Sequence, residues 1–323
     1  MSSEDIVFDP RSDVKLCVGG TDPVTFTACS RSLARASSVF ERMLFGQFME
    51  SKPANSEDWV VELPEDEPKA LSIFLHISHG HFDQVPRTPS MDDLYSLTVL
   101  SNYYDGTHIL EPWIGRWMSL VEDDTKPSKA SMAKNLWIAW EFGRKDPFCR
   151  LARRMLMESD GSEEPHLRMQ PDIIERISAN RLMTIQALLD IISKLVNGLL
   201  VVDEKPRWCR HAEWMGPHRC ESMILGSITF CLARGGLWPL PQAEDVMDSI
   251  VGLRRKMTQL VIHDIGKVDG FDHTHCSPMQ FLLGEMDRVF IDIRNPVTKD
   301  DLEAMDKQWK RLTKARQKDK DDS

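Results

Sequence analysis

A histidine and an aspartate stand side by side at His263-Asp264, and their chemistry comes closest to that of a hydrolase. Adjacent His and Asp on one helix can bind a divalent metal ion that activates a water molecule. Such a site also needs an earlier histidine on the same helical scaffold and a later aspartate on another helix. The nearest upstream histidine is His218, and a Gly-Gly pair and two prolines interrupt the chain between it and His263.

The local string His263-Asp-Ile-Gly-Lys267 resembles the HD-type metal phosphohydrolases. We favour a simpler interpretation, in which a helix ends here with Asp264 and Lys267 solvated and Gly266 as its C-cap. The hydrolase is the alternative from the enzyme class, and the sequence predicts that the chain is not an enzyme.

Zinc-ligand residue types are concentrated in two short segments of the C-terminal half. Structural zinc takes four Cys or His ligands, usually in closely spaced pairs. The close pairs here lack the strong Cys-x-x-Cys spacing, so buried thiols and polar loop histidines are the competing interpretation. We assign no metal and no cofactor from the sequence, and leave open whether Cys209, Cys220, His273 and Cys276 bind zinc. The candidate residues are Cys209, His211, His218, Cys220, His273, His275 and Cys276.

Three further histidines, His76, His79 and His81, fall at a predicted helix end. They could form a pH-sensitive or metal-binding edge, but histidine is also favoured at helix C-termini by the helix dipole, and we prefer that explanation. The basic run at 307–320 is either a nuclear import signal or, as we prefer, a solvated helix face. No nucleophile elbow, phosphate loop or dinucleotide fingerprint occurs.

Composition is that of an ordinary globular protein, with 41% hydrophobic and 28% charged residues. The net charge of −10 argues against nucleic-acid binding, because phosphates must be neutralised by Lys and Arg. We expect no signal peptide and no apolar run long enough to span a membrane, which predicts an intracellular location in the cytoplasm or nucleus. The seven scattered cysteines are expected mostly as buried free thiols.

The elements that would position these residues change character along the chain. Alternating apolar residues predict a hairpin of strands at 14–18 and 24–28, and an amphipathic helix follows to about residue 50. Beyond residue 131 strand signals nearly vanish and helical periodicity dominates. The sequence predicts an α+β fold with these parts: a flexible leader at 1–12, an interaction domain at 13–120, a linker at 121–131, a helical domain at 132–290, and a charged amphipathic helix and tail at 291–323.

The helical periodicity is clearest at 132–142, 147–157, 180–200 and 221–233, and an apolar stripe runs through 246–260. A last helix is predicted at about 298–317. Thr298 and Asp301 are placed to cap its start.

The first predicted helix and the strand before it resemble the BTB/POZ family. The family pattern is Phe-x-Val-His-Lys-x-x-Leu-Ala-x-x-Ser-x-Val-Phe, and its His-Lys pair is replaced here by Cys29-Ser30. Asp13 corresponds to a buried acidic residue that pairs with a basic residue in a charged groove of some family members, and Ser30 stands where that basic residue would be. The matching residues are Phe26, Leu33, Ala34, Ser37, Val39 and Phe40.

Later segments are similar to a group of BTB proteins from filamentous fungi, and this resemblance covers about residues 13–290. It implies a short hairpin and small sheet flanked by helices, and a scaffold or adaptor that binds other proteins. A substrate adaptor of a cullin ubiquitin ligase is the alternative within this class. The segments are Leu63–Pro68, Ile77–Pro86, Leu94–Leu100, Pro112-Trp113, Leu136–Glu141 and Gly236–Pro239.

The resemblance also implies that the first strand and first helix could form a homodimer interface. These positions are equally suited to the core of the domain itself. The residues we expect at the interface are Val14, Leu16, Leu33, Val39 and Met43.

Overall fold

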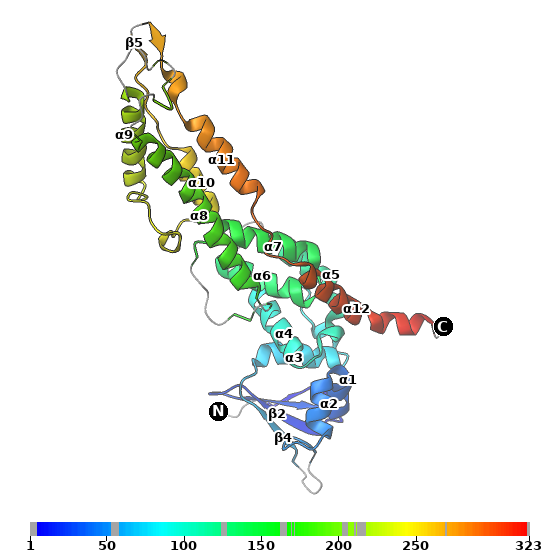
Figure 1. The fold of residues 1–323 in the computed structure, drawn as a ribbon. Coiled ribbons are helices and arrows are strands. Elements are labelled where there is room, and N and C mark those ends of the chain that lie inside the picture. Colours follow the sequence, from blue (N-terminus) through cyan, green and yellow to red (C-terminus); the bar gives the residue numbers. More distant parts are fainter. Residues whose placement is uncertain are drawn as a thin grey trace. The chain divides into compact units, whose positions relative to one another are not determined.

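The chain folds into two compact units in a computed structural model (Figure 1). Unit 1 comprises residues 1–151, 165–170 and 297–323, and unit 2 comprises 152–164 and 171–296. The mixture of helices with a small sheet confirms the predicted α+β class. The structure describes residues 5–52, 58–123, 128–161, 167–168, 170, 172–201, 206–209, 211, 218–268 and 270–321.

A four-stranded sheet forms one end of unit 1, in the order β1-β3-β2-β4. Strands β2 (Val14–Val18) and β3 (Val24–Ala28) are the predicted antiparallel hairpin. Strand β4 (Val60–Leu63) runs parallel to β2. The alternation in β2 buries Val14, Leu16 and Val18 on one face, as a period-two strand requires.

The predicted flexible leader at 1–12 is ordered where the structure describes it. Strand β1 (Ile6–Val7) pairs in parallel with Phe26 and Thr27 of β3. Phe8 is 1% exposed, and its backbone N–H donates to the Thr27 carbonyl at 2.8 Å. Burial of this aromatic side chain, together with the strand pairing, holds the segment on the sheet.

The single helix expected after β3 is two helices, α1 (Ser30–Ala36) and α2 (Ser38–Phe45). Ser37 separates them in an extended conformation with φ −152°. Its hydroxyl accepts the Phe40 N–H at 2.9 Å and donates to the Tyr104 carbonyl, so it caps α2 while bonding to a distant loop.

Helices α1 and α2 lie beside the sheet, and the other unit 1 helices continue from it (Figure 1). The helix predicted from about 107 to 120 is a 3₁₀ turn followed by α5. The remaining elements are α3 (Pro68–Ser78), η1 (Phe82–Gln84), α4 (Met91–Tyr103), η2 (Thr107–Leu110), α5 (Glu111–Asp123), α6 (Lys129–Glu141), the first half of α7 (Lys145–Glu158) and α12 (Lys299–Asp321).

The two units do not follow the boundaries expected from the sequence. Helix α6, expected in the helical domain at 132–290, packs on α4, and α12, expected as a separate terminal helix, packs on α6 and η2. Buried Glu141 explains this association. It accepts hydrogen bonds from Asn102 (2.9 Å) and Thr107 (2.5 Å), and Gln308 of α12 donates to its backbone carbonyl (3.0 Å). Part of the expected linker, 124–127, lies outside the described residues.

Unit 2 is organised around α8 (Ile173–Leu200), which packs against α11, α10 and α9. Strands β5 and β6 form a short hairpin that the sequence did not predict, and Gly270, with φ +85°, lies in its turn. The elements around α8 are α9 (Arg219–Arg234), η3 (Ala243–Asp245), α10 (Ile250–Thr258), β5 (Lys267–Val268), β6 (Phe271–Asp272), η4 (Thr274–Cys276) and α11 (Met279–Ile291).

Arg181 of α8 is a charged group buried inside unit 2 and is 4% exposed. Its guanidinium donates to the carbonyls of Ser159 (3.1 Å), Asp160 (3.1 Å), Val246 (2.6 Å) and Asp248 (3.0 Å). Burial lowers its pKa from the usual value. One side chain therefore joins two loops to the central helix by satisfying their carbonyls.

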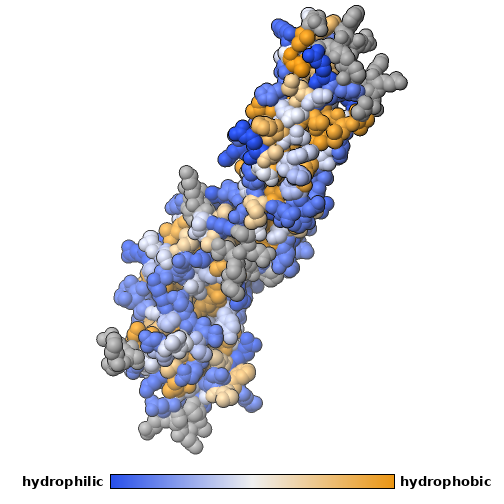
Figure 2. All heavy atoms as spheres, turned by 90° about the vertical axis from the view of Figure 1, so that its left-hand side faces the viewer, coloured by the Kyte–Doolittle hydropathy of each residue, from blue (hydrophilic) through white to orange (hydrophobic). Residues whose placement is uncertain are grey.

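By length and composition alone, α8 is apolar enough to cross a membrane, contrary to the expectation from the sequence. Half of its most apolar window is buried inside the protein, and Arg181 bonds to loop carbonyls, both of which are ordinary for a core helix. Hydrophilic and hydrophobic residues are mixed on the face drawn in Figure 2.

Candidate functional site

A hollow of about 550 Å³ opens in unit 1 between α2, the end of β4, the start of α3 and α4. Its apolar lining comes mainly from α2 and α4, whose helical periodicity places side chains three and four residues apart on one face. The apolar and aromatic lining residues are Val39, Met43, Leu63, Ala70, Val99, Leu100, Tyr103 and Tyr104.

Acidic residues surround this apolar lining at the end of β4 and the turn that follows it. Glu62, Glu65 and Glu67 are exposed, and Arg168 also lines the hollow. Asp66 is more enclosed and accepts the Tyr104 hydroxyl at 2.5 Å, and burial raises the pKa of its carboxyl. The hollow thus combines an apolar floor with a negatively charged rim.

Unit 1 has several exposed aromatic side chains, and one of them lies in the hollow. Tyr103 is 62% exposed and lines it, while Phe45 (48%) and Phe48 (60%) follow Met43 along the chain. Contiguous exposed apolar surface, unlike single scattered residues, is characteristic of surfaces that bind other molecules.

The structure divides the predicted interface residues into two groups. Val14, Leu16 and Leu33 are at most 1% exposed and belong to the core of unit 1. Val39 and Met43 are half-buried and line the hollow. The homodimer interface itself stays a prediction, and only Val39 and Met43 of this set reach the surface.

Asp13 is bonded to Ser30, at the position where the family resemblance expects a basic partner. Its carboxylate accepts the Ser30 backbone N–H and hydroxyl, both at 2.8 Å, and lies 3.4 Å from the Lys52 ammonium. Burial acts to raise the pKa of Asp13, but these hydrogen bonds and Lys52 together lower it. Asp13 therefore stabilises the first turn of α1.

Of the three histidines predicted at a helix end, His79 and His76 have different surroundings. His79 accepts the Cys29 backbone N–H at 3.0 Å through Nε2, and its Nδ1 contacts the Leu75 carbonyl at 2.9 Å. Burial lowers the pKa of His79, and the same cause lowers that of His76, whose ring packs against Phe8. His79 thus connects the end of α3 to the start of α1 in its neutral form.

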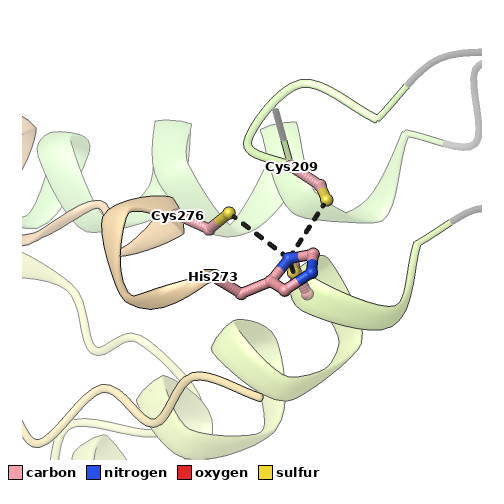
Figure 3. Close-up of side chains that lie close together, drawn as sticks. Cys209, His273 and Cys276 are labelled. Atoms are coloured by element: carbon pink, nitrogen blue, oxygen red, sulfur yellow. Dashed lines mark hydrogen bonds between the residues drawn. The ribbon is translucent and has the colours of Figure 1, made fainter. Parts of the chain in front are cut away.

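A second candidate site lies in unit 2, where Cys209, Cys220, His273 and Cys276 converge (Figure 3). His273 Nδ1 lies 3.6 Å from Cys209 Sγ, 3.3 Å from Cys220 Sγ and 3.9 Å from Cys276 Sγ. The four ligand atoms all lie within 4.8 Å of one another. His273, Cys220 and Cys276 are at most 3% exposed, and Cys209 is half-buried.

Crowding of the thiols in this cluster affects their protonation. Burial raises the pKa of Cys220, and the neighbouring thiols of Cys209 and Cys276 raise it further. A cation among the sulfurs would reverse this effect, because a coordinated thiol loses its proton. His273 Nε2 is buried and has no hydrogen-bond partner among the described residues.

Secondary elements and one carboxylate position the four side chains. Cys220 lies in the first turn of α9, and Cys276 ends the 3₁₀ turn that follows His273. Glu221, 3% exposed, accepts the backbone N–H of Arg207 at 2.5 Å and of Trp208 at 3.2 Å. This fixes the backbone immediately before Cys209.

The other zinc-ligand types named from the sequence lie outside the cluster. The His211 ring is edge-on to that of His273 with centroids 5.4 Å apart. His218 Nδ1 contacts Glu221 at 2.6 Å, and His275 is exposed. The structure therefore selects four of the seven candidates.

His263-Asp264 does not lie on a helix. Helix α10 ends at Thr258, and both residues are exposed in an irregular segment before β5. Asp264 accepts the Gly266 N–H at 2.7 Å in a local turn. Asp264 and Lys267 are exposed to solvent, as expected. The predicted C-cap is wrong, because Gly266 does not end a helix. The helix that a hydrolase site of this type requires around His263-Asp264 is also missing here.

Comparison with known proteins gives no assignment: no protein-family model and no curated protein matches the chain.

Proposed function

We propose that this chain is a non-enzymatic scaffold or adaptor that binds other proteins through a BTB/POZ-like domain at residues 13–120. The observation that carries the proposal is the apolar hollow between α2 and α4, with exposed Tyr103 at its edge. Protein interfaces are enriched in aromatic residues and Met at their centre and are polar at their rim. The hollow has both features.

The charge of the rim indicates which partner the hollow would bind. Glu62, Glu65 and Glu67 surround an apolar floor, and the chain as a whole carries a net charge of −10. A partner segment with an apolar face flanked by Lys or Arg would be attracted to this rim and would bury its apolar residues on the floor. Loss of affinity at high salt is expected for such a complex.

The test compares Tyr103→Ser, inside the hollow, with Phe82→Ser outside it. The two side chains have matched exposure, 62% and 61%, so neither variant should disturb the core. The tagged full-length chains are used to capture partners, which are identified by mass spectrometry, and light scattering measures self-association. We expect Tyr103→Ser to weaken partner binding about tenfold, an effect of the size seen when an interface aromatic is removed.

Tyr103→Ser should therefore bind partners more weakly than the control Phe82→Ser. If Tyr103→Ser and Phe82→Ser retain the same partners with the same affinity as the wild type, the hollow is not the binding surface. A cullin among the partners that need Tyr103 would favour the ligase adaptor. A second copy of the chain would favour the homodimer.

A further inference from the structure

The ligand geometry at Cys209, Cys220, His273 and Cys276 matches that of a single tetrahedral metal ion. With zinc–sulfur and zinc–nitrogen bonds of about 2.3 and 2.05 Å, a tetrahedron places sulfur and nitrogen about 3.6 Å apart. The three sulfur–nitrogen distances here are 3.6, 3.3 and 3.9 Å. The sulfur–nitrogen distances are therefore close to those that a single tetrahedral ion requires, and all four ligand atoms lie within 4.8 Å of one another.

The chemistry of the ligands selects the metal. Thiolate and imidazole ligands favour zinc over the hard cations, which prefer oxygen. Because all four atoms lie within 4.8 Å of one another, the site has room for one ion and not for a cluster of irons. Four protein ligands leave no open position for water or substrate, which is characteristic of a structural site and not a catalytic one.

We propose that these residues form a structural Cys₃His zinc site that holds together the part of unit 2 formed by α9, the β5–β6 hairpin and the segment at 206–209. The ligands come from three separate places in the chain, so one ion would cross-link all three. His273, fully buried, directs Nδ1 at the three sulfurs, and the described residues offer that nitrogen no oxygen or nitrogen partner. The proposal is independent of the protein-binding function above.

The surrounding structure gives a physical reason for such a cross-link. Strands β5 and β6 have only two residues each, and a hairpin of this size does not hold itself together in water. Outside the cluster, the ring contact His211–Phe271 joins His211 to β6, and Trp208–Phe281 joins the segment before Cys209 to α11. A metal ion bound only in the folded state would stabilise this region by its binding free energy.

The test measures zinc in the full-length protein, expressed without an affinity tag that binds metal and dialysed against metal-free buffer. We expect about one zinc per chain in the wild type, and much less in Cys220→Ser and His273→Asn. Matched controls are Cys231→Ser, a half-buried cysteine on the same helix, and His275→Asn, an exposed histidine two residues from His273. Both controls should retain the full amount.

Two further measurements keep the proposal falsifiable if the ligand variants fold poorly. Refolding wild-type protein with Co²⁺ in place of zinc should give the visible absorption bands of a tetrahedral cobalt–thiolate site. Titration of thiols under denaturing conditions should recover all seven cysteines. Wild-type protein without zinc and without those cobalt bands would overturn the proposal, as would a disulfide between two of the cluster cysteines.

Discussion

Replacement of Glu141 by Gln should remove a specific pH dependence from the stability of unit 1. Glu141 is 2% exposed and connects α4, η2 and α12 through Asn102, Thr107 and Gln308. Burial raises the pKa of its carboxyl from 4.5 to about 7, although the hydrogen bonds from Thr107 and Asn102 act to lower it. The charged form is therefore less favourable in the folded protein than in water.

The direction and size of the effect follow from this difference. Between the unfolded and folded pKa values the folded state binds more protons, so stability falls as the pH rises from about 4.5 through about 7. A shift from 4.5 to about 7 makes the contribution of Glu141 about 2.5 kcal/mol smaller at about pH 8 than at about pH 5. Other groups titrate equally in wild type and variant, so the difference between the two proteins isolates Glu141.

The assay is urea unfolding of wild type and Glu141→Gln at both pH values, followed by circular dichroism. Because the chain has two compact units, each transition is fitted separately. We expect the wild type to lose about 2.5 kcal/mol relative to the variant on going from the lower to the higher pH. Glu122→Gln is the control, since it removes an exposed carboxylate from α5 in the same unit.

Two results would refute the reasoning. One is a stability difference between wild type and Glu141→Gln that does not change with pH. The other is a change of opposite sign, which would mean that Asn102, Thr107 and Gln308 hold the carboxylate ionised in the folded state despite its burial.

Buried Arg181 and half-buried His79 give predictions of a similar kind. Arg181→Met should destabilise unit 2 by about 3 kcal/mol in urea unfolding, because the buried carbonyls of Val246 and Asp248 lose their hydrogen-bond donor. An unchanged urea midpoint would show that water replaces the guanidinium. His79 has a lowered pKa, so the folded state binds fewer protons than the unfolded state. The wild type should therefore lose stability relative to His79→Gln as the pH falls below about 6.5. Parallel plots of unfolding free energy against pH for the two proteins would contradict this.

Local patterns in the sequence were sufficient for many individual elements. The hairpin at 14–18 and 24–28 is confirmed residue by residue, because alternation fixes which face of a strand is buried. The predicted cap of the last helix is also confirmed: Thr298 N–H donates to Asp301 Oδ2 at 2.8 Å, and Asp301 N–H to Thr298 Oγ1 at 3.2 Å. A capping box involves residues only three apart, so the sequence contains all of its parts.

Features that depend on distant residues were missed. Ser37 interrupts the first helix because its hydroxyl reaches the Tyr104 carbonyl, 67 residues away. Nothing in the sequence near Ser37 indicates that bond. The position of α12 in unit 1 depends on Gln308 and Glu141, which are separated by 167 residues. A glutamate within the apolar segment 132–142 was the available signal, since a buried carboxylate requires donors from elsewhere in the fold.

The metal-ligand cluster shows the same limit for a candidate site. The sequence supplied the residue types, but spacing alone could not choose among seven candidates, because His273 lies 64 residues from Cys209 and 53 from Cys220. Zinc sites recognisable from sequence have pairs on one turn, where the chain itself sets the distance between ligands. Here only His273 and Cys276 form such a pair, and α9 and the segment held by Glu221 bring the other two sulfurs to them. The fold, not the local spacing, therefore brings the four ligand atoms together, and variants of Glu221 should disturb their arrangement through Cys209 without removing a ligand.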